Sequence, residues 1–231
     1  AFLCLHGPYG EDGRIQGMFE YLGIPYSGSG VLSSAIGINK AVQKKLMVSS
    51  GFESPAFFSV MKEDFSQEKI YSLFSRVQRE IGFPCVVKPA NQGSSIGVSI
   101  LNTESKEEFE KALMNAFFIK TLTADEWNAV KNKTEYIRTL TDIREGVGIP
   151  LTIIIGSKKE TVHQPEVLLA KIEDAFRTGA QSLSLESLDS ESEVLIEGFI
   201  EGKEFSCIVI RNEDFNPVAL PPTEIRKGKE L

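Results

Sequence analysis

A lysine followed by a loop rich in glycine and serine is the feature of this sequence best suited to chemistry. Lys88 ends an apolar run, and the loop 92–97 follows it shortly before the apolar residues resume. Glycine lets the backbone approach a ligand closely, so the loop N–H groups and the hydroxyls of Ser94 and Ser95 can bind phosphate oxygens. A buried ammonium group is costly unless it meets an anion. The segment therefore predicts a phosphate site, with an ordinary hairpin turn as the alternative.

The order of these residues excludes a P-loop. In that motif the lysine follows the glycines at the start of a helix, whereas Lys88 precedes them on a strand. The glycines are therefore expected to act as a lid over the phosphates. A second cation, Lys40, follows Ser33 and Ser34 in a segment with helical periodicity, and a solvated position on the helix surface is the alternative for it.

The run 194–205 could bind the rest of a nucleotide. A purine needs an acceptor for its amino group, backbone donors along its edge and apolar contacts on its faces, and a ribose needs a carboxylate. Glu197 and Glu204 could serve as the two acceptors. The backbone around Phe199 and its ring could serve as the donors and the apolar contact. A hairpin with exposed glutamates is the alternative.

Composition and charge limit the class of protein. The chain has 231 residues, of which 42% are hydrophobic and 25% charged, as in soluble globular proteins with one large or two ordinary domains. A net charge of −7 argues against a nucleic-acid binder. No run approaches the roughly 18 apolar residues of a membrane span. Cys4, Cys85 and Cys207 each stand alone in apolar runs, which favours free thiols in a core and a reducing cytoplasm.

Helices and strands must position these groups, and the spacing of apolar residues predicts where they lie. Helices and strands alternate early in the chain. Later strands are expected to pair antiparallel, with 194–199 joined to 204–210 as a hairpin. This order predicts a mixed α/β or α+β class. A segment rich in Ser, Glu and Asp at 182–192 is expected to be a linker. We expect helices at 11–22, 31–50, 66–81, from Ser105 onwards, 124–140 and Pro165–Arg177, strands at 1–5, 56–60, on both sides of the loop 92–97, 149–155, 194–199 and 204–210, and a turn at 212–216.

Taken together, these stretches resemble the D-alanine–D-alanine ligases of the ATP-grasp superfamily. The matching segments follow the order of the family. They are LHGPYGEDGRIQG at 5–17, GIPYSGSG at 23–30, NK at 39–40, VKPANQGSSIGVS at 87–99, and VLIEGFIEGKEF at 194–205.

The resemblance implies an ATP-grasp fold of α/β (α+β) class, in which ATP lies between two antiparallel sheets. Residues 1–36 would be the remnant of an N-terminal α/β substrate domain. Residues 37–193 would form the central lid domain with a long insert at about 118–192, and 194–231 would begin the C-terminal domain. The chain starts without Met inside an apolar run, and the acidic metal ligands of the family would lie beyond Leu231. We therefore expect a fragment truncated at both ends, inactive by itself and without metal ligands of its own.

The resemblance also implies roles for single residues. Lys40 and Lys88 would bind phosphates under a lid formed by Ser94 and Ser95, and His6 would lie near the first amino-acid site. The expected catalytic residues are Ser94 and His6, and the expected nucleotide-binding residues are Lys40, Lys88, Ser94, Ser95, Glu197, Gly198, Phe199, Ile200 and Glu204.

The family reaction uses ATP with magnesium or manganese. One D-alanine carboxylate attacks the terminal phosphate, and the amine of a second D-alanine displaces phosphate from the resulting acyl phosphate. A closed lid protects this intermediate from water. The resemblance further implies a cytoplasmic homodimer that serves peptidoglycan precursor synthesis, without a membrane or nucleic-acid partner.

Three features depart from the family pattern. Arg14 replaces a small hydroxyl residue, Asn39 replaces a common Asp, and the segment 118–192 is longer than expected. The second substrate is not specified by these residues, so a D-alanine–D-lactate type of ligase or another carboxylate–amine ligase stays open. A non-catalytic module whose insert binds a partner is a further alternative.

Overall fold

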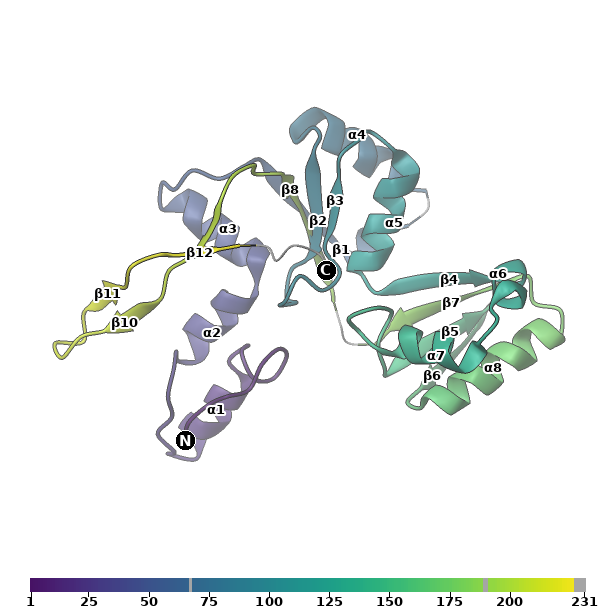
Figure 1. Ribbon diagram of the computed structural model, residues 1–231, viewed down its shortest axis with the longest axis horizontal. Helices are drawn as coiled ribbons and strands as arrows, with labels where there is room; N and C mark the ends of the chain where they lie inside the picture. Colours follow the sequence, from purple (N-terminus) through teal and green to yellow (C-terminus); the bar gives the residue numbers. More distant parts are fainter. Residues whose placement is uncertain (67, 189–190, 227–231) are drawn as a thin grey trace. The chain divides into compact units, whose positions relative to one another are not determined.

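The computed structural model describes residues 1–66, 68–188 and 191–226 (Figure 1). The density of internal contacts divides the chain into two units, Ala1–Phe199 and Ile200–Leu231. Helices and antiparallel sheets together confirm the mixed α/β (α+β) class. Strand β8 (Glu193–Gly198) is hydrogen-bonded into a sheet of the first unit. The domain boundaries expected after residues 36 and 193 stay predictions.

Three helices open the chain: α1 (Arg14–Tyr21), α2 (Val31–Ile38) and α3 (Lys40–Ser49). The single helix expected over 31–50 is divided at Asn39, whose backbone is extended. The Asn39 side chain caps α3 by accepting a hydrogen bond of 2.8 Å from the N–H of Val42. The strand expected at 1–5 is wrong, because no described segment pairs with it to form a ladder. Cys4 and Cys207 are exposed rather than buried, and only the expectation for Cys85 is confirmed.

The first sheet has the order β1-β8-β2-β3, and every neighbouring pair is antiparallel. Its other strands are β1 (Phe57–Met61), β2 (Cys85–Pro89) and β3 (Ser99–Leu101). The hairpin expected between 194–199 and 204–210 is wrong, because β8 inserts between β1 and β2 and both of its edges are occupied. β2 and β3 pair antiparallel, so the strands expected on both sides of the loop 92–97 are confirmed.

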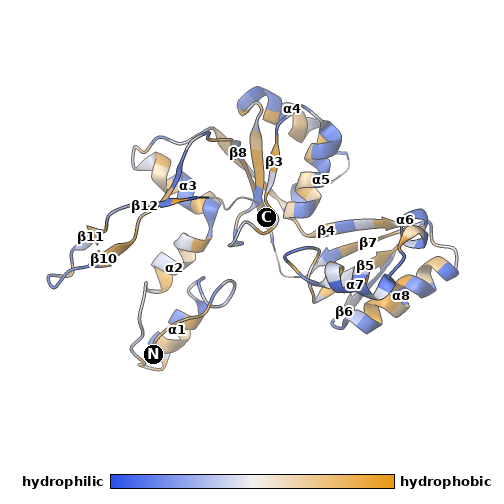
Figure 2. Ribbon diagram, viewed as in Figure 1, coloured by the Kyte–Doolittle hydropathy of each residue, from blue (hydrophilic) through white to orange (hydrophobic). Residues whose placement is uncertain are grey.

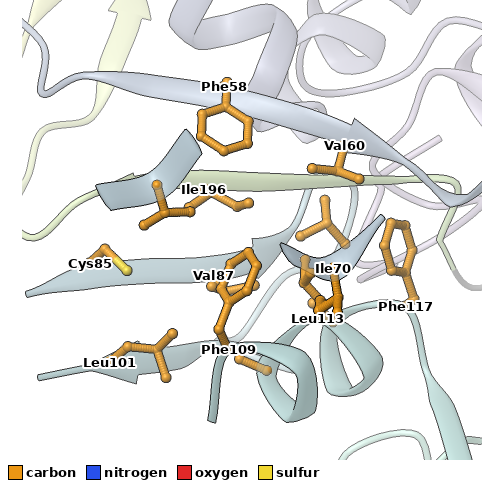
Figure 3. Close-up of a cluster of buried hydrophobic side chains, with 14 residues drawn as sticks. Phe58, Val60, Ile70, Cys85, Val87, Leu101, Phe109, Leu113, Phe117 and Ile196 are labelled. Carbon is orange, nitrogen blue, oxygen red and sulfur yellow. The ribbon is translucent and has the colours of Figure 1, made fainter. Parts of the chain in front are cut away.

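Helices α4 (Ile70–Glu80) and α5 (Lys106–Ala116) lie against the first sheet and bury its apolar face (Figure 1). Ser105 caps α5 by accepting from the N–H of Glu108 at 3.2 Å. Side chains of the sheet and the two helices meet in one buried cluster (Figure 3), which includes Phe58, Cys85, Val87, Leu101, Phe109, Leu113 and Ile196.

Alternation along the strands sends the next residues to the opposite face of this sheet. Val87 and Ile196 belong to the buried cluster, so their neighbours Lys88 and Glu197 point away from it. Helix α3 packs on that second face, where Ala41 and Leu195 belong to one small buried cluster. The alternation of side chains along β2 and β8 thus places Lys88 and Glu197 on the same face of the sheet, beside α3.

The insert folds into a second antiparallel sheet of order β4-β7-β5-β6 with its own core. Its strands are β4 (Ile119–Thr123), β5 (Leu151–Ile155), β6 (Lys158–Val162) and β7 (Ser182–Ser187). Its helices are α6 (Ala124–Ala129), α7 (Lys133–Thr141) and α8 (Pro165–Arg177). Figure 2 shows both hydrophilic (blue) and hydrophobic (orange) residues along α8, as expected for a helix with one buried face.

Two expectations for the insert need correction. The linker expected at 182–192 is occupied by β7 up to Ser187, a strand whose alternate residues Leu183, Leu185 and Ser187 are buried. The helix expected over 124–140 is two helices, because Thr123 and Asn132 each cap a separate start. The helix Pro165–Arg177 is confirmed with the expected bounds.

The second unit consists of two strand pairs. β9 (Glu204–Ser206) pairs with β12 (Thr223–Ile225), and β10 (Val209–Arg211) pairs with β11 (Pro217–Ala219). The expected turn at 212–216 is confirmed, because the Asn212 side chain accepts from the N–H of Asp214 and of Asn216. Within the described residues, no helix has the length and hydrophobicity to cross a membrane.

Candidate functional site

Three lysines and one glutamate gather on the face of the first sheet that carries α3. Lys40 and Lys44 are one turn apart on α3, Lys88 is the penultimate residue of β2, and Glu197 lies on β8. One carboxylate oxygen of Glu197 forms an ion pair with Lys88, and the other lies 2.7 Å from Nζ of Lys44. Three ammonium groups exceed the two nearby carboxylates, Glu197 and Glu191, by one charge, which suits an anionic ligand.

The cluster is largely shielded from water. Glu197 is 8% exposed, and the side chains of Lys44 and Lys88 are 16% and 20% exposed. Burial by itself would raise the pKa of Glu197, but the contacts with Lys44 and Lys88 outweigh it and lower the pKa. The pKa of Lys40 is lowered, first by burial and then by the charge of Lys88, against a smaller opposite effect of Glu191.

We expect Glu197→Gln to be destabilising at neutral pH and less so in acid. The folded pKa of Glu197 is below its ordinary value, so its carboxylate stabilises the fold above the unfolded pKa, and this contribution is lost as pH falls through the folded pKa. Removing one partner of a buried ion pair lowers the unfolding free energy by at least about 3 kcal/mol. We expect a loss near this lower limit, because the side chains of both lysines are partly exposed to solvent.

Urea unfolding in neutral and in acidic buffer measures this effect. The difference in unfolding free energy between the unmodified protein and Glu197→Gln should shrink as pH falls. Glu53→Gln is the matched control, because Glu53 is exposed and the same charge is removed. An equal difference at both pH values would contradict the expectation.

The loop after Lys88 has an unusual backbone. Ser94 and Ser95 have φ of 52° and 57°, and both are exposed. The N–H of Ile96 donates to the carbonyl of Gly93 at 3.1 Å and holds the turn. Left-handed conformations are uncommon outside glycine, and strained residues cluster at functional sites. The turn thus presents two hydroxyls to solvent at some conformational cost, as expected for a loop that meets a ligand.

Gly97→Ala should destabilise the protein, whereas Gly93→Ala should not. Gly97 has φ of 70°, and an added Cβ would lie 2.8 Å from Cγ of Pro89 and 3.2 Å from Cζ of Phe118. We expect a loss of about 1–3 kcal/mol in unfolding free energy. At Gly93 an added Cβ meets no atom within 4 Å, so the expected change is below about 1 kcal/mol. Thermal unfolding of both variants tests this, and equal melting temperatures would contradict it.

A buried carboxylate missed by the sequence analysis fixes the start of α3. Glu191 accepts from the backbone N–H and side-chain amide of Asn91 at 2.7 and 2.8 Å. Asn91 in turn accepts from the amide of Asn39 at 3.0 Å, and the N–H of Lys40 donates to the carbonyl of Ala90 at 2.9 Å. Burial raises the pKa of Glu191, and the hydrogen bonds that its carboxylate accepts oppose the rise. The network attaches α3 to the end of β2 and so positions Lys40, whose Nζ contacts the carbonyl of Gln92.

His6 occupies a different environment. Its side chain is 89% exposed, and its Nδ1 lies 3.9 Å from Oε1 of Glu11. A cleft of about 700 Å³ lies between the loop that follows His6 and the start of α3, and Asp12, Asn39 and Glu191 are among its lining residues. His6 is not among the residues that line this cleft, and its role stays a prediction.

The remaining expected residues fall at the end of β8 and in the second unit. Gly198 ends β8, and the N–H of Phe199 donates to the carbonyl of Pro84 at 3.1 Å. Ile200 and Glu204 are exposed residues of the second unit, and their roles stay predictions. Among residues 1–66, 68–188 and 191–226, no three His, Cys, Asp or Glu side chains are arranged to hold a metal ion.

Family models and curated relatives point to one family. The D-ala D-ala ligase N-terminus model matches residues 1–29, and the D-ala D-ala ligase C-terminus model matches residues 46–125. The D-alanine–D-alanine ligase of Bacillus licheniformis is 47% identical over 117 residues, which are 51% of this chain and 32% of that protein. The ligase of Pelotomaculum thermopropionicum is 40% identical over 157 residues, 68% of this chain and 48% of that protein. The chain therefore spans half or less of the length of these relatives.

Solved structures share the fold. D-alanyl-alanine synthetase A from Vibrio cholerae has a TM-score of 0.57 at 18% identity and covers 99% of this chain, which in turn covers 46% of it. The D-alanine–D-alanine ligase from Coxiella burnetii has a TM-score of 0.55 at 22% identity. The match covers 97% of this chain and 43% of that ligase. These similarities confirm the expected ATP-grasp fold. Because two models of one family match in order and relatives share 40–47% identity, the chain belongs to the D-alanine–D-alanine ligase family.

Proposed function

We propose that this chain carries the nucleotide-binding part of an ADP-forming ligase that joins two D-alanines at the expense of ATP. The product, D-alanyl-D-alanine, would serve peptidoglycan precursor synthesis. The observation that carries the proposal is the buried cluster of Lys40, Lys44, Lys88 and Glu197 beside a strained, exposed turn. Residues 1–36 would contribute to the substrate domain and 37–193 to the lid domain with its insert. The remainder would begin the C-terminal ATP-grasp domain.

The lysines would neutralise the phosphate groups. Phosphoryl transfer depends chiefly on positioning and charge compensation. Lys88 lies close enough to Lys40 for its charge to add to the effect of burial, which lowers the pKa of Lys40. Ser94 and Ser95 would add hydroxyl contacts and cover the phosphates, so that water is kept from the acyl phosphate. In this role Ser94 is the residue of the lid that we place nearest the reacting groups.

The nucleoside would lie along the end of β8. Glu197 would accept from the adenine amino group, and the backbone of Gly198 and Ile200 would contact the edge of the base. Phe199, which is partly exposed, would cover a face of the ring, and Glu204 would bind the ribose. These assignments are supported by the position of Glu197 at the cluster and by the order of the motif.

The proposed reaction has two steps, each with its own leaving group. The carboxylate of one D-alanine attacks the terminal phosphate, which releases ADP and forms an acyl phosphate. The amine of the second D-alanine then attacks the acyl carbon, and inorganic phosphate leaves. His6 is proposed to lie near the first D-alanine in the working enzyme. Magnesium or manganese would accompany the ATP phosphates, and because the described residues hold no ligand cluster, we assign it no protein ligand.

We further propose a cytoplasmic homodimer, without a nucleic-acid or membrane partner. The cytoplasm is where ATP is available, and the net charge of −7 does not favour binding to nucleic acid. Analytical ultracentrifugation would test the dimer, and a monomer at micromolar concentration would contradict it.

The proposed function is tested by calorimetry with ATP and by product analysis. We expect this chain to bind ATP below millimolar concentration and GTP more weakly. We also expect the complete protein to release phosphate only when D-alanine is present. Mass spectrometry with D-alanine and D-lactate offered together should find the dipeptide. A depsipeptide product would change the second substrate, and no ATP binding at millimolar concentration would contradict the proposal.

A further inference from the structure

One carboxylate is shared by two ammonium groups in the candidate site. Glu197 contacts Lys88 through Oε1 and Lys44 through Oε2. The proposed function requires Lys88 to contact a phosphate group, yet in this structure it is paired with Glu197. Lys88 must therefore exchange one anionic partner for another when a nucleotide binds.

This exchange would cost free energy, because the buried carboxylate of Glu197 would lose the ammonium group of Lys88 as its partner. Glu197 is 8% exposed, and a buried charge without a partner is strongly destabilising. Lys44 removes the penalty because it stays beside Oε2 at 2.7 Å. It is held there by two further contacts, since Nζ donates to Oγ of Ser54 at 2.8 Å and lies 5.8 Å from the ring centroid of Phe57. Lys44 is thus anchored on the side away from Lys88.

We propose that Lys44 is a positioning residue, which holds Glu197 ionised and in place so that Lys88 can transfer from Glu197 to a phosphate group of the nucleotide. This inference rests on the proposed function. Departure of Lys88 also frees Oε1 of Glu197, and that oxygen becomes available to accept from the amino group of the base. Two contacts are exchanged in one event, and Lys44 acts on the phosphate only through Glu197.

The alternative role for Lys44 is direct contact with a phosphate, and a double-mutant cycle separates the two. The probes are inorganic tripolyphosphate and ATP, with affinities measured by calorimetry on the full chain. Lys44→Met keeps the apolar stem but removes the charge, so Lys88 stays on Glu197 and both probes should bind about tenfold more weakly or worse. In a Glu197→Gln background Lys88 is already free, and adding Lys44→Met should change tripolyphosphate affinity by less than about twofold.

Three controls accompany the cycle. Lys44→Arg keeps the charge and should restore binding to within about threefold of the unmodified protein. Lys45→Met removes the same charge from an exposed neighbour on α3 and should leave affinity unchanged. Circular dichroism establishes that each variant is folded, and Lys44→Gln replaces Lys44→Met throughout should the latter not fold.

The outcomes distinguish this inference from the function on which it rests. Equal losses from Lys44→Met in both backgrounds would show direct phosphate contact and overturn the positioning role alone. Lack of binding of either probe to the unmodified chain would overturn the proposed function and the inference with it. A loss confined to the background with Glu197 intact, restored by Lys44→Arg, supports both.

Discussion

Replacing Lys88 with methionine should weaken ATP binding by about 10- to 150-fold, because a charge-assisted hydrogen bond contributes about 1.5–3 kcal/mol. Lys88 lies near the end of β2 on the face opposite the buried cluster, and its pairing with Glu197 shows that its ammonium reaches the centre of the site. The fold should tolerate the change better than loss of Glu197 would be tolerated, since Lys44 still compensates the carboxylate.

Calorimetry with ATP on the unmodified chain and on Lys88→Met measures this loss. Lys120→Met is the control, because Lys120 is an exposed lysine of the insert and its replacement changes the net charge equally. In the complete protein the same variant should slow D-alanine-dependent phosphate release. Unchanged affinity and turnover would remove Lys88 from the site and leave its burial beside Glu197 as a structural ion pair.

Local patterns were sufficient for the part of the site that one stretch of chain forms by itself. The sequence predicts strands on both sides of the loop that follows Lys88, and the antiparallel pairing of β2 with β3 confirms these strands. The start of α3 could also have been found, because Asn39 before a helical segment is a typical N-cap. Lys44 was missed, although its spacing of four from Lys40 places both on one side of a helix.

The rest depends on contacts between distant segments. Nothing near β8 in the sequence shows that it inserts between β1 and β2, so the pairing of Glu197 with Lys44 and Lys88 could not be derived from the motif alone. The sequence of β7 predicts a linker because its apolar residues are few. Its register is set by β4 and β5, which bury Leu183 and Leu185 on one face. A strand with one polar face resembles a loop in composition, and only its neighbours identify it.

The core of the insert provides its own spectroscopic probe. Trp127 is the only tryptophan of the chain and is fully buried in the second core. Its ring centroid lies 6.1 Å from that of Tyr136 and 6.3 Å from that of Phe176. The fluorescence of Trp127 therefore reports unfolding of the insert separately from the first sheet, whose buried cluster contains no tryptophan.

Leu185→Ala should lower the unfolding free energy reported by Trp127 fluorescence by about 2–5 kcal/mol, because Leu185 is fully buried on β7, between β4 and β5. Val167→Ala, at a partly exposed position of α8, is the control and should cost less than about 1 kcal/mol. ATP affinity should change by less than about twofold, because Leu185 belongs to the second core and the lysine cluster lies on the first sheet. If ATP affinity fell in proportion to the loss of stability, the insert and the nucleotide site would fold as one cooperative unit. Residues 119–187 would then support the site rather than form a separate core beside it.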